Sequence, residues 1–313
     1  MLALGRYLMG TRFELVLGGG ADPGRLRSVG EAALDEVERI EGLLSIYRPE
    51  SEAARVNSHA AEGWVRVHPD VFTLFQRCQA LSRATDGAFD ITVLPMLRAW
   101  GFIGASGHAA GAGEIAAARA VTGIRHISLD AETSSVRFDS PGVGLDLGAI
   151  GKGYALDAAA DILRDMGVRS ALMHGGTSTV IALGSSDNSE GWNIAIRDPG
   201  SEDGVLRSVT ITDGQALSVS AVHGKAFTSD DGRLLGHVLD PRTGSPCERA
   251  RLAAVVTDNA TDADALSTAL LVLGEAEAAT LPCFAPLFPD AAFVVPCEPQ
   301  TLSAASHSLS PAH

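Results

Sequence analysis

Residues 142–157 read GVGLDLGAIGKGYALD, a glycine-rich connection between a predicted strand at 143–147 and a predicted helix at 154–166. Closely spaced glycines at the entry to a helix let backbone N–H groups approach an anion, and the positive end of the helix dipole favours negative charge. The same glycines also suit a tight turn that packs closely and binds nothing. The segment therefore indicates either an anion-binding loop or a packing turn.

The spacing within this segment excludes the two common nucleotide-binding loops. A P-loop has a glycine separated by four residues from its Gly-Lys pair and a Ser or Thr after the pair, whereas Asp146 and Gly153 occupy those positions here. A dinucleotide fingerprint, Gly-x-Gly-x-x-Gly, fails because Leu147 follows Gly142 and Gly144 where the third glycine is required. We therefore expect neither a P-loop nor a Rossmann fold.

Helical spacing dominates the first part of the chain, and short alternating strands dominate the rest. We expect helices at 28–47, 70–81, 154–166 and 262–273. We expect strands at 126–129, 136–138, 143–147, 170–173, 180–183, 192–196, 206–211 and 252–256. This order favours an α+β fold over alternating βαβ units. The Gly/Ala-rich residues 104–113 suggest a flexible loop, and the tail at 298–313 is expected to be disordered, which leaves one domain at 1–297.

Charge and hydropathy exclude two classes of partner. The 313 residues include 24 basic and 38 acidic ones, a formal net charge of −14, and such a surface repels nucleic acid. No apolar run approaches the roughly 20 residues of a membrane helix. Arg6, Arg12 and Glu14 lie where a signal peptide would be apolar, so we expect a cytoplasmic protein. We expect free thiols at all four cysteines, Cys78, Cys247, Cys283 and Cys297, with a disulfide between the last two as the alternative.

A second candidate site lies in residues 260–274, ATDADALSTALLVLG. On a helix, Asp264 and Thr268 share one face, while Leu266, Leu270 and Leu273 point nearly the opposite way. We therefore expect a carboxylate and a hydroxyl on the face away from the core. Hard oxygen ligands of this kind suit Mg²⁺, which completes its shell with waters and substrate phosphates. The alternative is a solvated helix start whose acidic residue complements the helix dipole.

Two further motifs have both a structural and a functional interpretation. HVLDPRTGSP at 237–246 indicates a tight turn after a short strand, and its His237 is a candidate base or ligand near neutral pH. GAFDITVLPMLRAWGF at 87–102 is typical of core packing around one acidic residue, Asp90. Neither motif decides the function alone.

The order of these motifs resembles the ApbE family, the FAD:protein FMN transferases. The ordered segments are Met9-Gly10-Thr11, LLSIYRPESEAARVN (43–57), TDGAFDITVLPMLRAWGF (85–102), DLGAIGKGYALD (146–157), WNIAIRDP (192–199), HVLDPRTGSP (237–246) and DADALSTALLVLG (262–274). The resemblance covers roughly residues 7–275. It implies a two-lobed α+β fold with mixed or antiparallel sheets and flanking helices, with FAD in a cleft between the lobes and Mg²⁺ on its pyrophosphate.

The resemblance also implies the residues of the site, position by position. The implied flavin contacts are Met9, Tyr47, Ala88, Phe89, Asp90, Asp146, Lys152 and Leu239. The implied metal ligands are Ala149 through its carbonyl, Asp264 and Thr268. Ser267 lies where some members have a further metal-side carboxylate, and it offers only a hydroxyl. Lys152 is a candidate second cation at the diphosphate. His237, or an acidic residue near the metal, is the candidate catalytic base.

Two segments depart from the family pattern. Gly175–Thr177 reads Gly-Gly-Thr, where many members have Asp or Asn in third place. Ser220–His223 reads Ser-Ala-Val-His, where many members have Ser-Gly-x-Tyr or Ser-Gly-x-Phe. Alanine reaches positive φ less readily than glycine, so we expect this second loop to be reshaped.

The resemblance implies an Mg²⁺-dependent transfer of the FMN part of FAD to a Thr or Ser hydroxyl of an acceptor flavoprotein, with release of AMP. Two alternatives use the same site. One is an FAD pyrophosphatase, in which water attacks and FMN and AMP are released, and the other is an FAD-binding protein that has lost catalysis. Retention of FMN on an acceptor separates the first two activities. A purely structural role is disfavoured because it leaves Asp264, Thr268 and the glycines without a purpose.

Overall fold

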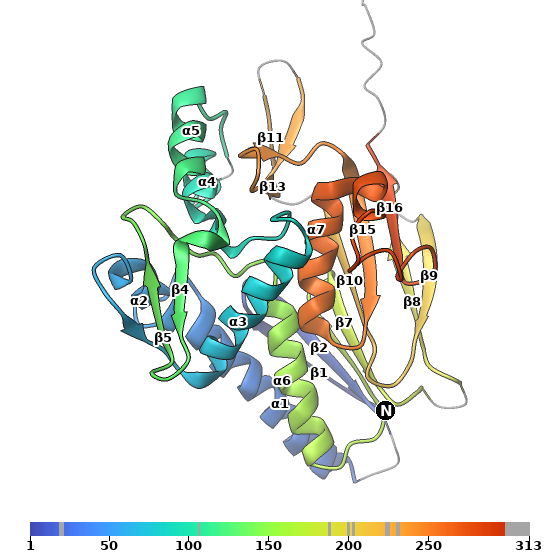
Figure 1. Cartoon of the computed structure of the whole chain (residues 1–313). Helices are drawn as coiled ribbons and strands as arrows, with labels where there is room; N and C mark the ends of the chain where they lie inside the picture. Colours follow the sequence, from blue (N-terminus) through green and yellow to red (C-terminus); the bar gives the residue numbers. More distant parts are fainter. Residues whose placement is uncertain are drawn as a thin grey trace, which may run out of the picture.

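The chain is built around one large antiparallel sheet (Figure 1). The computed structural model describes residues 1–18, 22–105, 107–186, 189–198, 201, 204–222, 226–229 and 232–297. Within these residues the sheet has seven strands in the order β1-β2-β6-β7-β10-β15-β16. Their bounds are β1 Leu2–Leu8, β2 Thr11–Leu17, β6 Ala171–Gly175, β7 Thr179–Leu183, β10 Ala216–Ala221, β15 Ala250–Thr257 and β16 Ala292–Pro296. Antiparallel pairing throughout confirms the α+β expectation and excludes a Rossmann fold.

Both faces of this sheet are covered, because successive residues of its central strands, which point to opposite faces, are buried. Met173 and Ile181 belong to the core beneath helices α1 (Pro23–Leu44), α6 (Gly151–Asp165) and α7 (Ala260–Ala278). Leu172 and Val180, one residue away on the same strands, pack instead beneath the hairpin of β8 (Trp192–Arg197) and β9 (Val205–Ile211). The period of two in side-chain direction explains this division.

A second region, mostly helical, lies beside the three-helix face (Figure 1). It contains α2 (Glu52–His59), α3 (Pro69–Ala84), the 3-10 turns η1 (Ile91–Val93) and η2 (Ile124–His126), α4 (Leu94–Ala99), α5 (Ala112–Ala120), and a small sheet of β3 (Val65–Arg66), β5 (Ser135–Phe138) and β4 (Ile127–Asp130). The hairpins β11 (Ala226–Thr228)–β12 (Leu234–Gly236) and β13 (Leu239–Asp240)–β14 (Ser245–Pro246) pack on α4 and α5. The Trp100 indole N–H donates to the Gly244 carbonyl at 2.8 Å and ties these parts together.

The structure confirms the four predicted helices but moves their ends. The first begins earlier, at Pro23, because the Asp22 carboxylate accepts the Arg25 N–H at 2.9 Å as an N-cap. The last helix breaks at Gly274, as expected, with φ +70°, and then resumes to Ala278. The predicted loop at 104–113 gives way to α5 at Ala112. The tail at 298–313 lies outside the described residues.

The predicted strand at 143–147 is wrong. Val143, Leu145 and Leu147 are buried, which explains the apolar alternation, but their backbone does not join a sheet. The Leu145 N–H donates to Asn57 Oδ1 at 2.6 Å, and the Leu145 carbonyl accepts from Asn57 Nδ2 at 2.9 Å. The side-chain amide of Asn57 therefore makes the hydrogen bonds that a neighbouring strand would make. The alternation of apolar residues in this segment reflects burial and not strand pairing.

The four cysteines all lie in the described part of the chain, and each is a free thiol. The free-thiol expectation is therefore confirmed, and the alternative bridge between Cys283 and Cys297 is absent. No helix in the residues that the structure describes is both long and apolar enough to cross a membrane.

Candidate functional site

A cavity of about 400 Å³ lies where the three-helix face of the large sheet meets the helical region. It is lined by segments that are far apart in the sequence, from the helical region, the glycine-rich loop, β10, β13 and α7. These segments bring together most of the predicted site residues, namely Ala88, Phe89, Asp90, Asp146, Ala149, Lys152, His237, Leu239, Asp264 and Thr268.

The two remaining predicted residues, Met9 and Tyr47, line an adjoining cavity of about 310 Å³. Asp146 and Gly148 line both cavities, so the glycine-rich loop forms the partition between them. Met9 has φ +50° in the two-residue turn between β1 and β2, which presents its side chain to Gly151 at the start of α6. The Tyr47 ring is largely exposed, and burial of its hydroxyl followed by the charge of Asp146 raises the Tyr47 pKa.

Asp90 is held in place by other protein groups. Its Oδ1 accepts the Thr92 N–H at 2.8 Å and the Thr92 hydroxyl at 2.6 Å. Its Oδ2 accepts the Ile124 N–H at 2.7 Å and, more weakly, the Ser82 hydroxyl at 3.3 Å. The carboxylate therefore fixes the shape of the cavity wall, tying the start of η1 to η2, and its capacity for a ligand is largely used.

Helices α6 and α7 each carry a carboxylate that accepts hydrogen bonds from backbone N–H groups in the N-terminal part of the other helix. Asp157 of α6 accepts the backbone N–H groups of Ala260 and Thr261, at 2.7 and 2.8 Å, and so caps α7. Asp264 of α7 accepts the Gly153 N–H of α6 at 3.1 Å. Each acid satisfies a helix N-terminus, where free N–H groups and the dipole favour negative charge. These hydrogen bonds fix the position of Asp264 at the cavity.

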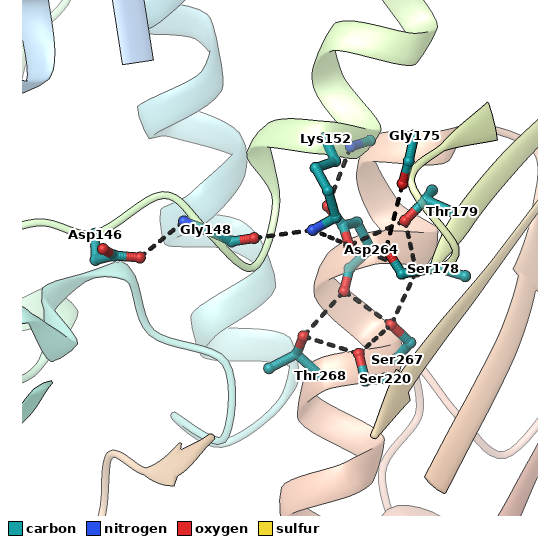
Figure 2. A network of polar contacts seen from close by, with 12 residues as sticks. Asp146, Gly148, Lys152, Gly175, Ser178, Thr179, Ser220, Asp264, Ser267 and Thr268 are labelled. Atoms are coloured by element: carbon teal, nitrogen blue, oxygen red, sulfur yellow. Dashed lines mark hydrogen bonds and ion pairs between the residues drawn. The ribbon is translucent and has the colours of Figure 1, made fainter. Parts of the chain in front are cut away.

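The expectation that Asp264 lies on a face away from the core is wrong, because only 3% of the residue is exposed. It is surrounded by hydroxyl groups (Figure 2). Thr179 and Ser218 contact Asp264 Oδ1 at 3.3 and 3.5 Å, and the Ser267 hydroxyl donates to the Asp264 carbonyl at 3.0 Å. A solvated helix start, the alternative interpretation, is therefore also excluded.

The ammonium of Lys152 is the cation closest to this carboxylate in the described residues. Lys152 Nζ lies 3.5 Å from Asp264 Oδ1 and donates to the Gly148 carbonyl at 3.2 Å (Figure 2). The Thr268 hydroxyl contacts Ser220 Oγ at 3.2 Å, one turn further along α7. The glycine-rich loop and α7 thus place one negative charge, one positive charge and several hydroxyls at one end of the cavity.

This donor set fits a magnesium ion that shares its shell with a ligand. No group of three or more His, Cys, Asp and Glu side chains that could hold a metal occurs in the described residues. Mg²⁺ is commonly bound by one or two carboxylates together with substrate phosphates and waters. Asp264, the Thr268 hydroxyl and the Ala149 carbonyl offer one charge and two neutral oxygens on the cavity wall, which suits an ion brought in with a polyanionic ligand.

The hydroxyls that the large sheet contributes to the site were not predicted from the sequence. Ser218 and Ser220, two residues apart on β10, point to the same side, and both contact Ser267, at 3.2 and 2.8 Å. Ser178 and Thr179 follow the Gly-Gly pair, and Ser178 lines the cavity. The signal was the alternation of serine within ALSVSA at 216–221, which identifies one polar face on an otherwise apolar strand.

The two departures from the family pattern both border the cavity. Thr177 lines it directly, so a hydroxyl stands there in place of an acid or amide. Ala221 is the last residue of β10 and pairs with Leu252. It is not among the residues with positive φ, so the expected difficulty for alanine does not arise there. His223 lies outside the described residues.

His237 lines the same cavity, close in sequence to Leu239 of β13. The Phe102 ring approaches the imidazole edge-on, with centroids 6.4 Å apart. Phe102 belongs to the apolar cluster of α4, α5 and the β11–β14 hairpins. His237 thus contacts a buried aromatic ring and also lines the cavity.

The fold and cavity define an α+β protein whose candidate ligand site lies between an interior strand of the large sheet, the N-terminal parts of two helices and a helical lobe. The model of the ApbE family matches residues 9–282, and the chain belongs to this family. Its curated relatives include the FAD:protein FMN transferase of Klebsiella pneumoniae (strain 342), 34% identical over 76% of this chain and 73% of the relative. The enzyme of the same name from Escherichia coli K12 is 31% identical over 83% and 75%.

Solved structures agree with this membership. The ApbE protein of Thermotoga maritima superposes with a TM-score of 0.85 at 29% identity, covering 94% of each chain. The apo form of the flavinyl transferase ApbE of Pseudomonas stutzeri gives 0.80 at 32% identity, covering 96% of this chain and 92% of that one. The family and fold expected from the sequence are therefore confirmed.

Proposed function

We propose that this chain is an FAD:protein FMN transferase that uses Mg²⁺ to move the FMN part of FAD to a Thr or Ser hydroxyl of an acceptor protein, with release of AMP. Family membership and the names of the relatives support a flavin transferase. The observation that carries the finer proposal is the placement of Asp264 and Lys152 at one end of a cavity whose other walls hold the implied flavin contacts.

The reaction is a phosphoryl-type transfer, so positioning and charge neutralisation matter more than covalent catalysis by the protein. The acceptor oxygen bonds to the FMN-side phosphorus, the bond from that phosphorus to the bridging oxygen breaks, and AMP leaves with the electron pair. The hydroxyl proton passes to a base. Mg²⁺ held by Asp264, Thr268 and the Ala149 carbonyl would neutralise negative charge on the diphosphate.

The protein's own residues supply the rest. Lys152, at the start of α6, brings a second positive charge to the cavity wall. His237, on the same cavity, is the proposed base that takes the hydroxyl proton, a role suited to imidazole near neutral pH. Tyr47 and Met9, in the adjoining cavity, give an apolar surface on which a planar ring system can lie.

One assay separates this proposal from its alternatives. Purified protein is incubated with FAD, Mg²⁺ and an acceptor flavoprotein, AMP is measured by chromatography, and the acceptor is examined by mass spectrometry. We expect AMP in step with an FMN adduct on a Thr or Ser. AMP together with free FMN and no adduct would indicate a pyrophosphatase, and bound FAD without AMP would indicate a non-catalytic flavin carrier.

A further inference from the structure

Lys152 occupies a position that helix electrostatics disfavours. It is the second residue of α6, whose first turn carries no acidic side chain. The N-terminal end of a helix is its positive end, so a cation there is repelled by the dipole. The position of Lys152 therefore needs a compensating negative charge from outside its own helix, and Asp264 of α7 provides it at 3.5 Å.

The residue type is also unusual for this chain. Of its 24 basic residues only Lys152 and Lys225 are lysines, and all the others are arginines. Arginine forms rigid two-pronged bonds to carboxylates, whereas lysine is a compact charge on a flexible stem with rotatable donors. A lysine at this position suits a contact that must form and break.

The two ends of the pair differ in freedom of movement. Asp264 is fixed, because its Oδ2 accepts the Gly153 N–H and its other oxygen contacts Thr179 and Ser218. The Lys152 side chain is 23% exposed and lines the cavity, and besides Asp264 its ammonium contacts the Gly148 carbonyl of the glycine-rich loop. The ammonium can therefore leave Asp264 by side-chain rotation alone.

We infer that Lys152 is a displaceable counter-ion of Asp264. In the FAD-free protein its ammonium neutralises the buried carboxylate and occupies the position at which a divalent cation would bind. When the diphosphate of FAD enters, the ammonium moves to it and exposes Asp264, so that the metal binds tightly only together with FAD. This inference rests on the proposed function, because it takes Asp264 to be the metal-side carboxylate.

The physical reason is competition for one carboxylate. A buried carboxylate without a partner is costly, so Asp264 retains a cation in every state of the site. In the FAD-free protein a metal must both displace the ammonium and tolerate its repulsion at short range. With FAD bound, two phosphate groups attract both cations, and the competition is relieved. FAD and the metal thus increase each other's affinity, as linkage requires.

The test measures Mn²⁺ binding to the FAD-free protein by isothermal titration calorimetry, with Lys152→Met and a matched control. Arg77→Met is the control, because Arg77 pairs with Asp262, two residues from Asp264, and its loss changes the net charge equally. We expect Lys152→Met to bind Mn²⁺ about tenfold or more tightly than the wild type, since a charge at contact distance is removed. Arg77→Met should stay within about twofold.

The outcomes distinguish this inference from the proposed function. Equal Mn²⁺ affinity of the wild type and Lys152→Met, with binding present in both, would overturn the counter-ion while leaving the metal site. Absence of Mn²⁺ binding in both proteins, even with saturating FAD, would overturn the metal part of the proposed function and the inference with it. FAD integrity is checked by chromatography in each titration.

A second measurement does not depend on the folding of the Lys152 variant. Amines of the wild-type protein are acetylated briefly, and modification of Lys152 is compared with that of the Met1 α-amine by peptide mass spectrometry. Excess Mg²⁺ without FAD should increase acetylation of Lys152, because its ammonium is displaced from the carboxylate. Asp264→Asn should do so without metal. Unchanged acetylation in both cases would contradict the inference.

Discussion

Asp262 and Asp264 are two residues apart on α7, yet they line different cavities and are bound by their basic partners in different ways. Asp262 lines a cavity of about 620 Å³ between α1, α3, α6 and α7, where Arg77 binds both of its oxygens. Asp264 lines the proposed flavin cavity, where Lys152 makes one longer contact of 3.5 Å. Both side chains are largely buried, at 14% and 4% exposed, so burial alone does not distinguish them.

The difference lies in how completely each carboxylate is satisfied. The planar Arg77 guanidinium meets Asp262 in two-pronged geometry, and the bonding raises the Arg77 pKa further above its ordinary value. In the same cavity Arg39 is held by Glu36 and Asp70. In the larger cavity Asp262, Glu36 and Asp70 are thus bound by arginines. In the smaller cavity a flexible lysine holds Asp264 through one longer contact. We interpret a buried carboxylate that is held by a flexible lysine as a feature of a site that exchanges ions.

The strongest test of this contrast is Asp264→Asn, for which AMP release should fall on the order of 10³-fold. A metal contributes several kcal/mol to neutralising charge in the transition state, and each 1.4 kcal/mol is about tenfold in rate. Asparagine retains an acceptor for the Gly153 N–H, so the fold should persist. Removal of divalent cations with EDTA should reproduce the loss in the wild type.

Asp264→Ala is the less informative variant because the residue is buried. It removes the acceptor of the Gly153 N–H, and an unsatisfied buried group costs about 1–3 kcal/mol. Thr268→Val should reduce turnover less than Asp264→Asn, since it removes a neutral ligand. Near-normal turnover of Asp264→Asn would mean that α7 holds no catalytic metal.

The next test concerns the close approach of α6 and α7, which separates the two cavities. A Cβ added at Gly153 would lie 2.0 Å from the Ala260 carbonyl oxygen and 2.9 Å from the Asp264 Cβ. Gly153→Ala should therefore lower the free energy of unfolding by about 3 kcal/mol or more, measured by urea denaturation. Gly42→Ala in α1 is the control, because its Cβ meets nothing within 4 Å and helix propensity should make it neutral or stabilising.

A third test asks whether the Asp264 end of the cavity recognises the diphosphate. FAD should bind about tenfold or more tightly than FMN in the absence of divalent cations, because only FAD carries the diphosphate and the AMP half that the cavity can hold beyond the flavin. Flavin fluorescence titration measures both affinities. Equal affinities would show that the flavin ring alone determines binding, and the contrast between the two acids would lose its functional meaning.

The sequence predicted which residues lie together where motifs set the local geometry. The glycine-rich loop and the helix at 260–274 carried Lys152, Asp264 and Thr268 to one cavity, as their order implied. It failed where tertiary contacts decide. Asp264 is buried because α6 approaches α7 closely. That approach requires a glycine at position 153, which is far from Asp264 in the sequence. The loop at 143–147 bonds to Asn57 in a way that no local pattern encodes.

The hydroxyl cluster shows the same limit. Ser218 and Ser220 lie on a strand whose pairing with β7 and β15 is fixed only by the folded sheet. Residue spacing indicated their common face but not that this face meets Asp264 and Ser267. By contrast, the turn within residues 237–246 was predictable, because such a turn depends on its own residues.

We expect the smallest effect when the arginine partner of Asp262 is removed. Arg77→Met removes the two-pronged partner of Asp262, whose pair is partly open to solvent because the Arg77 side chain is 47% exposed. Such pairs contribute about 1 kcal/mol or less to stability, so urea denaturation should show a small loss. AMP release and FAD affinity should stay within about twofold of the wild type, because Asp262 lines a cavity that shares none of its described residues with the proposed flavin cavity. A loss of turnover as large as that of Asp264→Asn would show that charge anywhere near the start of α7, rather than the loosely held carboxylate, governs the reaction.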